Sequence, residues 1–340
     1  MNTGERKQKI LQILIESYIE TGEPVGSKLL AEKLGNTVSS ATIRNDMAEL
    51  VGMGYLEQPH TSAGRIPTAA AFRLYIDRLM RPHKLSAADR EEIDETLKRA
   101  GDPETLMEDA SALLAQTTGC AAVSTTPSEQ STVVRRVELL RVSPRAIALL
   151  LMTGSGVLRS RVCRMGTDPS DGALVRLGKT LTTAFVGRPL CEIGLPQVQG
   201  LLPLLGEEGF ACLPLLSAFY ELVQASAEAE VLLRGQMNLL RHPDYAPERA
   251  HSLLGFLSER EQLVQMLAAY PGGLRVVLGS ESLCPELSGS SLIVTRYAPA
   301  GGNGTIGIIG PLRMNYATAI PRLTYVAEAV GRMLDRFAEE

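Results

Sequence analysis

The stretch from Pro59 to Pro67, PHTSAGRIP, gathers side chains that could do chemistry on one short polar segment bracketed by two prolines. An imidazole, two hydroxyls, a glycine and a guanidinium come from His60, Thr61, Ser62, Gly64 and Arg65. Such a set could serve acid–base catalysis, hold a phosphate or contact nucleic acid. The same residue types are common in surface turns. The flanking elements therefore have to decide between these uses.

Three helices are predicted ahead of this segment. Apolar residues recur at helical spacing from Ile10 to Ile19, and the pattern stops at Gly22 and Pro24, which are helix-ending residues. Ser27 is a suitable N-cap for a second helix, which is short because a glycine ends it within two turns.

A third helix follows. Ser39 or Ser40 can cap it, and Ile43, Met47 and Leu50 recur at the spacing i, i+4, i+7, which predicts the buried face. The order of helix, short helix, glycine-containing turn and serine-capped helix is the layout of a helix-turn-helix, with this third helix in the recognition position.

The opposite face of the third helix suits a DNA groove. At about 100° per residue, Asn45 points almost directly away from the buried face, between Ala41 and Ala48 and flanked by Thr42 and Arg44. Asn can pair with adenine, Arg with guanine, and Thr or Ala can touch a thymine methyl group. Taken alone, the helix fits a solvated amphipathic helix with a mixed polar face equally well.

The opening segment then becomes the tip of a hairpin. Residues 55–57 predict a short strand, residues 59–64 a turn and residues 65–67 the returning strand. A two-stranded hairpin after a recognition helix is a wing. In a wing, Gly64 lets the backbone approach a phosphate or a groove, and Arg65 neutralises a phosphate or enters the minor groove. The predicted DNA contacts are Ser39, Ser40, Thr42, Arg44, Asn45, His60, Thr61, Ser62, Gly64 and Arg65.

Thr61 and Ser62 are assigned as donors to phosphate, whereas His60 contacts phosphate or caps the turn.

The charge distribution permits sequence-specific DNA binding. The net charge of −4 argues against a protein that coats nucleic acid indiscriminately, but residues 1–82 carry +1 and the remainder −5.

Composition bounds the class of protein. The 340 residues are 45% hydrophobic and 21% charged, as in soluble globular proteins, and their number favours two or three domains. The longest apolar run, residues 146–152, is far shorter than the roughly 20 residues of a membrane span, and the polar start lacks a secretory signal. We therefore expect a cytoplasmic protein. The five dispersed cysteines and four scattered histidines indicate neither disulfides nor a metal site.

Helices continue after the wing. Thr68 can cap one, Ser86 with Asp89 forms a capping-box variant that opens another, and Asp102 before Pro103 opens a third that glycine 119 closes. Four strands are then expected up to residue 165, helices from about 171 to 229, a strand near 231–235, a helix over 247–269, three strands, and a final amphipathic helix from about 315. Strands, helices and strands again predict an α+β domain interrupted by an insertion.

Three segments together resemble a known family. They are RKQKILQILIESYIETGEPVGSKLLAEKLGNTVSSATIRNDMAELVGMGYLEQPHTSAGRIPT at 6–68, LLRGQMNLLRHPDY at 232–245 and GTIGIIGPLRMNYATAIPRLTYVAEAV at 304–330. These segments resemble the signatures of the heat-inducible transcription repressors of the HrcA family. One departure follows the wing, where Ala70 and Ala71 stand in place of an expected polar residue and a glycine.

The resemblance implies a fold and a function. The expected fold is an α+β multidomain protein with an N-terminal winged helix-turn-helix and a GAF-like domain interrupted by an inserted dimerisation domain. The expected boundaries are 1–84 for the winged helix and its linker, 85–165 and 248–340 for the GAF-like domain, and 166–247 for the insertion. The implied function is repression of chaperone operons by a homodimer on an inverted-repeat operator, relieved by heat, with the chaperonin as a further partner and no cofactor.

Other motifs lead to weaker predictions. GNGTIG at 302–307 fits a dinucleotide-binding pattern but continues as a strand, and GALVRLGKT at 172–180 nearly matches a phosphate-binding loop but fits a helix face better. An arginine-rich run is solvated and paired with acids, or docks an anionic partner. Its members are Arg135, Arg136, Arg141, Arg145, Arg159, Arg161 and Arg164.

Two other function classes compete with the repressor. One is a regulator whose GAF-like domain binds a small molecule in a mostly apolar pocket. The other is an enzyme with an appended DNA-binding module, which the lack of a catalytic constellation disfavours.

Overall fold

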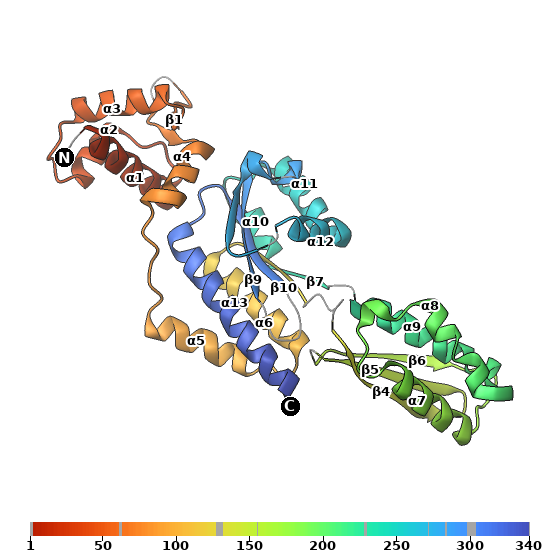
Figure 1. Ribbon diagram of the computed structural model, residues 1–340. Coiled ribbons are helices and arrows are strands. Elements are labelled where there is room, and N and C mark those ends of the chain that lie inside the picture. The colour runs from red at the N-terminus through yellow and green to blue at the C-terminus, as the bar shows by residue number, and fades with distance from the viewer. Residues whose placement is uncertain are drawn as a thin grey trace.

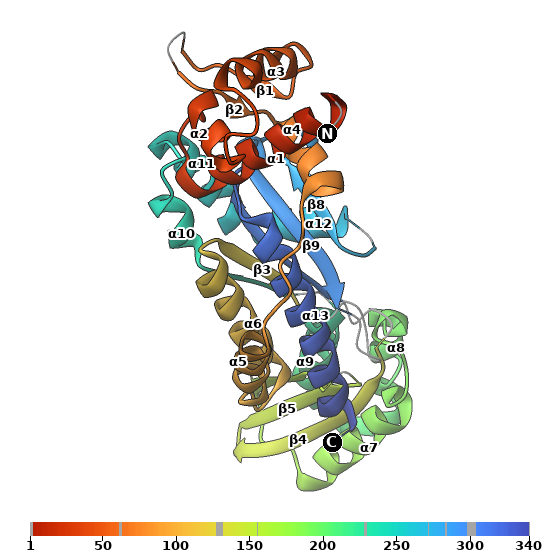
Figure 2. The same ribbon diagram turned by 90° about the vertical axis from the view of Figure 1, so that its left-hand side faces the viewer.

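The computed structural model describes residues 3–60, 63–126, 132–154, 156–227, 230–270, 272–282, 284–297 and 304–339. The chain forms three parts that follow one another along an elongated molecule (Figures 1 and 2). We call them the winged-helix part (residues 3–79), the central part (residues 87–126 and 230–339) and the inserted part (residues 132–227).

The winged-helix part has the predicted order of elements. These are α1 (Thr3–Thr21), α2 (Ser27–Lys33), α3 (Ser40–Gly52), β1 (Leu56–Glu57), β2 (Ile66–Pro67), α4 (Ala69–Leu74) and the π-helical turn η1 (Tyr75–Leu79). Strands β1 and β2 pair antiparallel, with Leu56 opposite Pro67. Ser39 is the N-cap of α3 and Thr68 that of α4, and both side chains accept a hydrogen bond from a backbone N–H in the first turn.

The central part is a three-layer structure. Its elements are α5 (Ala87–Lys98), α6 (Pro103–Thr118), β3 (Ala121–Thr125), β7 (Val231–Arg234), α10 (Gln236–Arg241), α11 (Pro247–Ser258), α12 (Arg260–Ala268), β8 (Arg275–Leu278), β9 (Ser290–Tyr297), β10 (Gly304–Pro311) and α13 (Tyr316–Glu339). The strands form an antiparallel sheet in the order β7-β3-β10-β9-β8. Alternate residues of β3 bury on opposite faces: Ala122 with α6 and α13, Val123 with α11 and α12.

The predicted helix signals of the central part are confirmed. Ser86 and Asp89 form the capping box of α5, and Asp102 caps α6 with Pro103 at its first position. The single helix predicted over 247–269 is wrong in one respect. The chain breaks at Glu259, whose ψ of 94° is extended, so that α11 and α12 are separate helices. Neither Gly nor Pro marks this break in the sequence.

The inserted part consists of β4 (Val134–Ser143), β5 (Ala146–Thr153), β6 (Leu158–Arg164), α7 (Asp171–Phe185), α8 (Leu195–Gln199) and α9 (Leu213–Ala227), with 3-10 turns between α7 and α9. The strands form their own antiparallel sheet in the order β4-β5-β6. Val137, Leu149 and Cys163 face inward and share one hydrophobic core with α7 and α9.

This arrangement differs from the expected boundaries of 85–165, 166–247 and 248–340. Strands β4 to β6 belong with α7 and α9, not with the five-stranded sheet, and β7 joins β3 in that sheet, so the segment 230–247 lies in the central part. The alternation of residues along a strand predicts which faces are buried. It does not predict which sheet the strand enters.

Candidate nucleic-acid interface

Helix α3 presents the faces that its spacing predicts. Ile43, Met47 and Leu50 are buried, whereas Arg44 and Asn45 are exposed. Within the described part of the chain, neither of these two exposed side chains has a hydrogen-bond or ion-pair partner. Figure 1 shows α3 on the side of the winged-helix part that faces away from the central part. The helix is therefore open to a large ligand such as duplex DNA.

A buried carboxylate fixes α3 on α1, and the sequence analysis did not identify it. Asp46 is 2% exposed. Arg6 donates to it from Nε at 2.7 Å and from Nη2 at 3.0 Å. These hydrogen bonds raise the pKa of the Arg6 guanidinium. A buried charge needs such a partner, and the signal in the sequence was an acid beside Met47, next to the predicted buried face.

Three hydroxyls organise the N-terminus of α3. The Ser39 Oγ accepts from the backbone N–H of Thr42 at 3.1 Å and lies 2.8 Å from the Thr42 hydroxyl oxygen. The Ser40 Oγ lies 2.9 Å from the Ser27 Oγ, at the start of α2. The structure thus brings Ser39, Ser40 and Thr42 together at the end of the helix where the backbone dipole is positive.

Besides the pairing of β1 with β2, the wing pairs with the segment after α1, which the sequence did not reveal. Val25 and Arg65 exchange backbone hydrogen bonds of 2.9 Å in both directions. A Cβ on Gly64 would lie 2.5 Å from the backbone carbon and oxygen of Val25. In the structure, Gly64 therefore allows the hairpin to close on the segment after α1. Its predicted role of approaching a phosphate or a groove stays a prediction.

The remaining wing residues are only partly placed. His60 is exposed, and its carbonyl accepts from the Ala63 N–H at 2.9 Å. The Arg65 side chain is half-buried and folds back on the hairpin, where Nη1 lies 3.4 Å from the carbonyl oxygens of Ala63 and Gly64. Thr61 and Ser62 lie outside the described residues.

The arginine-rich run lies on β4 to β6 of the inserted part, with Arg145 in the turn between β4 and β5, far along the chain from α3. Several of its members pair with acids: Arg141 with Asp168 and Asp171, at 2.6 and 2.9 Å, and Arg161 with Glu221. These pairs favour the solvated and paired reading of the run over an anion-docking surface.

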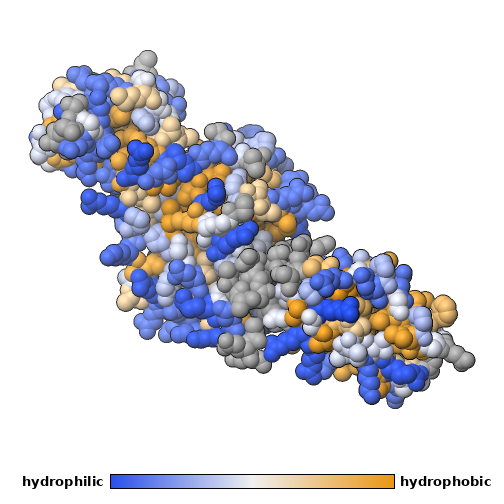
Figure 3. Space-filling view, viewed as in Figure 1, coloured by the Kyte–Doolittle hydropathy of each residue, from blue (hydrophilic) through white to orange (hydrophobic). Residues whose placement is uncertain are grey.

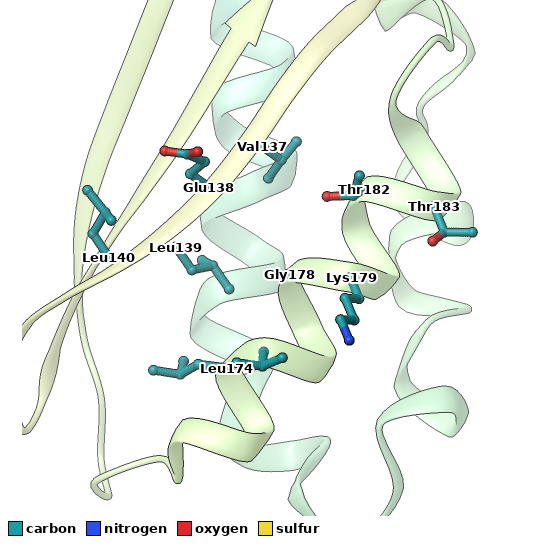
Figure 4. Close-up of a pocket in the computed structure, with 10 residues that line it drawn as sticks. Val137, Glu138, Leu139, Leu140, Leu174, Gly178, Lys179, Thr182 and Thr183 are labelled. Carbon is teal, nitrogen blue, oxygen red and sulfur yellow. The ribbon is translucent and has the colours of Figure 1, made fainter.

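A groove of about 550 Å³ opens between β4 and α7 of the inserted part (Figure 4). Leucines, valines and threonines form most of its lining, and its charged groups are one carboxylate, Glu138, and one ammonium, Lys179. A second groove, of about 880 Å³, lies between η1 and β8. Arg73, Arg275 and Glu281 line it.

Family models match nearly the whole chain. Residues 3–78 match the winged helix-turn-helix transcription repressor, HrcA DNA-binding model, and residues 104–320 match the HrcA protein C-terminal domain model. The chain belongs to the HrcA family of heat-inducible transcription repressors. The family is one of DNA-binding repressors and not of enzymes, which removes the reading of an enzyme with a DNA-binding module.

Relatives over the full length agree with this membership. The heat-inducible transcription repressor HrcA of Geobacter sulfurreducens is 33% identical over 98% of both chains. That of Mycolicibacterium vanbaalenii is 34% identical over 98% of both. A crystal structure at 2.2 Å resolution, described as a hypothetical protein, covers 99% of both chains with a TM-score of 0.68 and 22% identity, so the HrcA-family chain shares its fold.

One helical stretch of this HrcA-family chain is long and apolar. Among the described residues, Phe210–Ala227 is the one stretch whose length and composition would allow it to cross a membrane. Phe219 and Val223 within it are fully buried in the core of the inserted part. Its position is that of a core helix.

Proposed function

We propose that this HrcA-family chain represses heat-shock (chaperone) operons in the cytoplasm by binding an inverted-repeat operator as a homodimer, and that heat relieves the repression. The observation that carries the proposal is the outer face of α3, where Arg44 and Asn45 are exposed and open to a ligand. An Arg and an Asn are the side chains that pair bidentately with guanine and adenine in a major groove.

The remaining contacts are assigned to the phosphate backbone. Ser39, Ser40 and Thr42 lie at the positive end of α3 and suit a phosphate beside the major groove. On the wing we assign phosphate contacts to Arg65 and to the tip residues His60, Thr61 and Ser62. Gly64 contributes through the closure of the wing. The Arg65 side chain would have to rotate away from the Ala63 carbonyl to reach DNA, because its guanidinium faces the hairpin.

Alanine substitutions at the recognition helix test the assignment. We expect Arg44→Ala and Asn45→Ala each to weaken operator binding by about 1–3 kcal/mol per half-site, because each removes a bidentate base contact. Arg65→Ala should mainly reduce the dependence of affinity on salt, since a phosphate contact acts by releasing counterions. Gel shifts at several salt concentrations measure both effects.

The control is Arg99→Ala, which removes an exposed guanidinium at the end of α5, outside the winged-helix part. It should leave operator binding unchanged. Equal affinities for the wild type and all three winged-helix variants would contradict the assignment of α3 as the recognition helix.

We assign dimerisation to the outer face of the inserted sheet. The side chains of β4 to β6 that point away from α7 and α9 include Leu140, Leu158 and Val162, which are 51%, 54% and 59% exposed. They lie across from Ala148 and Met152 of β5 in the strand register. Apolar residues reach the surface over the inserted part in Figure 3 as well. An exposed apolar sheet face of this kind suits a second copy in a two-fold arrangement.

The finer fold assignments belong to the same proposal. We assign the central part as a GAF-like domain and the inserted part as the dimerisation domain, with boundaries near 132 and 229.

The chaperonin is proposed as a partner because the family resemblance implies it. Co-purification of the chaperonin with the wild-type chain, and the effect of added chaperonin on operator binding, test that partner.

A second candidate function is control by a small molecule. The groove between η1 and β8 favours it, because it combines apolar walls with the charged groups of Arg73, Arg275 and Glu281. A metabolite screen by thermal shift, followed by gel shifts with each hit, tests this function. Hits that leave operator affinity unchanged would count against it.

A further inference from the structure

The winged-helix part and the central part meet across a seam of three aromatic rings that pack at tilted angles. Tyr18 of α1, Phe72 of α4 and Tyr316 of α13 follow one another, with ring centroids 6.5 and 6.2 Å apart. Phe72 is 2% exposed and Tyr316 is fully buried. The Tyr316 hydroxyl donates to the carbonyl of Leu312 at 2.7 Å. Phe72 and Tyr316 thus form a buried contact between two parts that are distant in the sequence.

An arginine of the central part caps a helix of the winged-helix part across this seam. Arg313 donates from Nη1 to the carbonyl of Ile19 at 3.3 Å, in the last turn of α1. Carbonyls in the last turn of a helix lack partners within the helix, and a cation there is favourable. The Nε of Arg313 donates to both carboxylate oxygens of Asp244, at 2.9 and 2.8 Å. Its side chain is only 11% exposed.

A glycine makes room for this cap. Gly22 follows α1 with a φ of +73°, the left-handed conformation that favours glycine after a helix. A Cβ at this position would lie 2.9 Å from Cζ of Arg313. The guanidinium thus lies flat on the Gly22 backbone, so the end of α1 and the loop before α13 fit together.

A second arginine makes the reciprocal connection. Arg73 of α4 donates from Nη2 to the carbonyl of Val276 on β8 at 2.7 Å, and from Nε to Glu281 at 3.0 Å. Arg313 of the central part therefore reaches a backbone carbonyl of the winged-helix part. Arg73 of the winged-helix part reaches a backbone carbonyl and a carboxylate of the central part. The linker at residues 80–86 also lies along α13, where the His83 N–H donates to the Ala317 carbonyl at 2.9 Å (Figure 2).

We infer that this pair of arginine clamps around the aromatic seam is a latch that sets the orientation of the winged helix, and with it the spacing between the two recognition helices of a dimer. The inference rests on the proposed function for its link to the operator. A fixed orientation allows both half-sites to bind with little further ordering, whereas a released winged helix has to be ordered on each binding event. Releasing the latch should therefore reduce selectivity for half-site spacing.

Tryptic cleavage of the full-length chain tests the latch itself. Lys84 in the linker is an exposed cleavage site, whereas Pro82 after Arg81 protects that bond from trypsin. We expect Arg313→Met to raise the cleavage rate at Lys84 about tenfold, because opening of the seam releases the linker from α13. Asp244→Asn, which leaves Arg313 in place, should raise the rate less.

The matched control is Arg322→Met. Arg322 also bridges a carbonyl and a carboxylate, those of Thr117 and Asp89, each at 3.0 Å, but all three residues belong to the central part. Its loss should leave linker cleavage at the wild-type rate. Circular dichroism of each variant checks that the chain remains folded.

Spacing selectivity tests the connection to DNA. The probes are the operator duplex obtained by footprinting with the wild-type chain, duplexes with roughly one or two base pairs added between the half-sites, and a single half-site. We expect the ratio of affinities for natural and altered spacing to shrink about tenfold in Arg313→Met. Affinity for the single half-site should stay unchanged.

Two results would overturn the inference. In one, Arg313→Met and Asp244→Asn leave cleavage and spacing selectivity as in the wild type. In the other, they weaken binding to all three kinds of duplex by one factor, which means that the seam only stabilises the winged helix. Failure of the wild-type chain to bind any inverted repeat would instead contradict the proposed function, whereas the cleavage assay contains no DNA and tests the latch independently.

Discussion

The winged-helix part and the inserted part are attached to the central part in different ways. The buried side chains of α1, α3 and α4 belong to one hydrophobic cluster with those of α5, α6, α13 and one face of the five-stranded sheet. The inserted part has a cluster of its own, which contains residues of β4 to α9 alone among the described residues. Figure 1 shows the inserted part as a separate lobe at the end of the molecule.

Polar contacts join the described residues on the two sides of the junction between the central and inserted parts. The two chain segments that connect the central part with the inserted part are hydrogen-bonded to each other, since the Thr126 N–H donates to the Glu230 carbonyl at 2.7 Å. Arg159 of β6 forms an ion pair with the Glu230 carboxylate at 2.8 Å. Such partly exposed polar contacts contribute little beside a shared apolar core.

The comparison separates two mechanical roles. A shared core transmits orientation, because packed interiors deform little. A lobe with its own core can carry a dimer contact without straining the five-stranded sheet of the central part, to which it is connected. The orientation of the winged helix therefore depends on its packing against the central part, whereas the dimer contact that we propose lies on the inserted part.

The largest expected effect comes from truncating one phenylalanine in each region. Phe72→Ala and Phe219→Ala should each cost about 3–5 kcal/mol, the usual cost of removing a buried aromatic ring. Phe72 is 2% and Phe219 0% exposed, and Phe219 stacks on Phe185 at 5.0 Å. Phe72→Ala should lower the unfolding temperature of the winged-helix and central parts together. Phe219→Ala should unfold the inserted part at a lower temperature than the rest.

Hydrogen exchange measured by mass spectrometry along a thermal ramp resolves the parts. One shared transition for both variants would show that the inserted part is coupled to the central part as closely as the winged helix is, and the comparison would fail.

The next effect concerns the apolar face of the inserted sheet. Val162→Lys places a charge on that face and should weaken a dimer by about 2 kcal/mol, roughly thirtyfold in dissociation constant, because the ammonium would be buried without a partner. Val175→Lys is the matched control on α7. The two valines are 59% and 56% exposed. Sedimentation equilibrium measures the dissociation constants, and equal weakening by both lysines would place the dimer contact elsewhere.

A smaller effect is expected at the base of the wing. Gly64→Ala should cost about 1–3 kcal/mol, because its Cβ would lie 2.5 Å from the Val25 backbone and the hairpin would have to move. Gly52→Ala in α3 is the control. A Cβ there meets nothing within 4 Å, and alanine is favoured over glycine in a helix. Urea unfolding of both variants gives the two free energies, and a neutral Gly64→Ala would mean that the wing closes without this contact.

Local signals in the sequence predicted the elements well. The caps at Ser39, Ser86 and Asp102 act on the first turn of their own helices, so a few neighbouring residues determine them. The exposed face of α3 follows from helical spacing for the same reason. The order of strands in the two sheets could not be predicted from the sequence, because buried and exposed residues alternate along a strand in the same way whichever sheet the strand joins.

The contacts missed by sequence analysis join distant residues. Arg6 and Asp46 are 40 positions apart, and Arg313 and Ile19 are 294 apart. Nothing local distinguishes these arginines from solvated ones. The close approach of Val25 to the Gly64 backbone was missed as well, because Val25 lies before α3 and not beside the wing in sequence.

The smallest expected effect is a pH dependence of the seam, carried by His242. Its ring lies 3.8 Å from the Asp244 carboxylate that holds Arg313, and it meets the Tyr245 ring edge-on. Burial lowers the pKa of His242 below its ordinary value of 6.5, and the Arg313 charge lowers it further although Asp244 raises it.

The folded chain therefore binds a proton at this histidine less readily than the unfolded chain. The contribution of His242 to stability is complete above the unfolded pKa of 6.5 and is lost as the pH falls through the lower folded value. Because trypsin itself loses activity as its catalytic histidine is protonated, the linker cleavage rate is divided by the rate for an unstructured peptide substrate at the same pH. We expect this ratio to rise between about pH 7.5 and pH 5.5 in the wild type, and His242→Gln to flatten that profile. His60→Gln, which removes an exposed imidazole from the wing, should keep the wild-type profile. If both glutamine variants behave as the wild type does, protonation near Asp244 has no influence on the seam, and the difference between the two attachments rests on apolar packing alone.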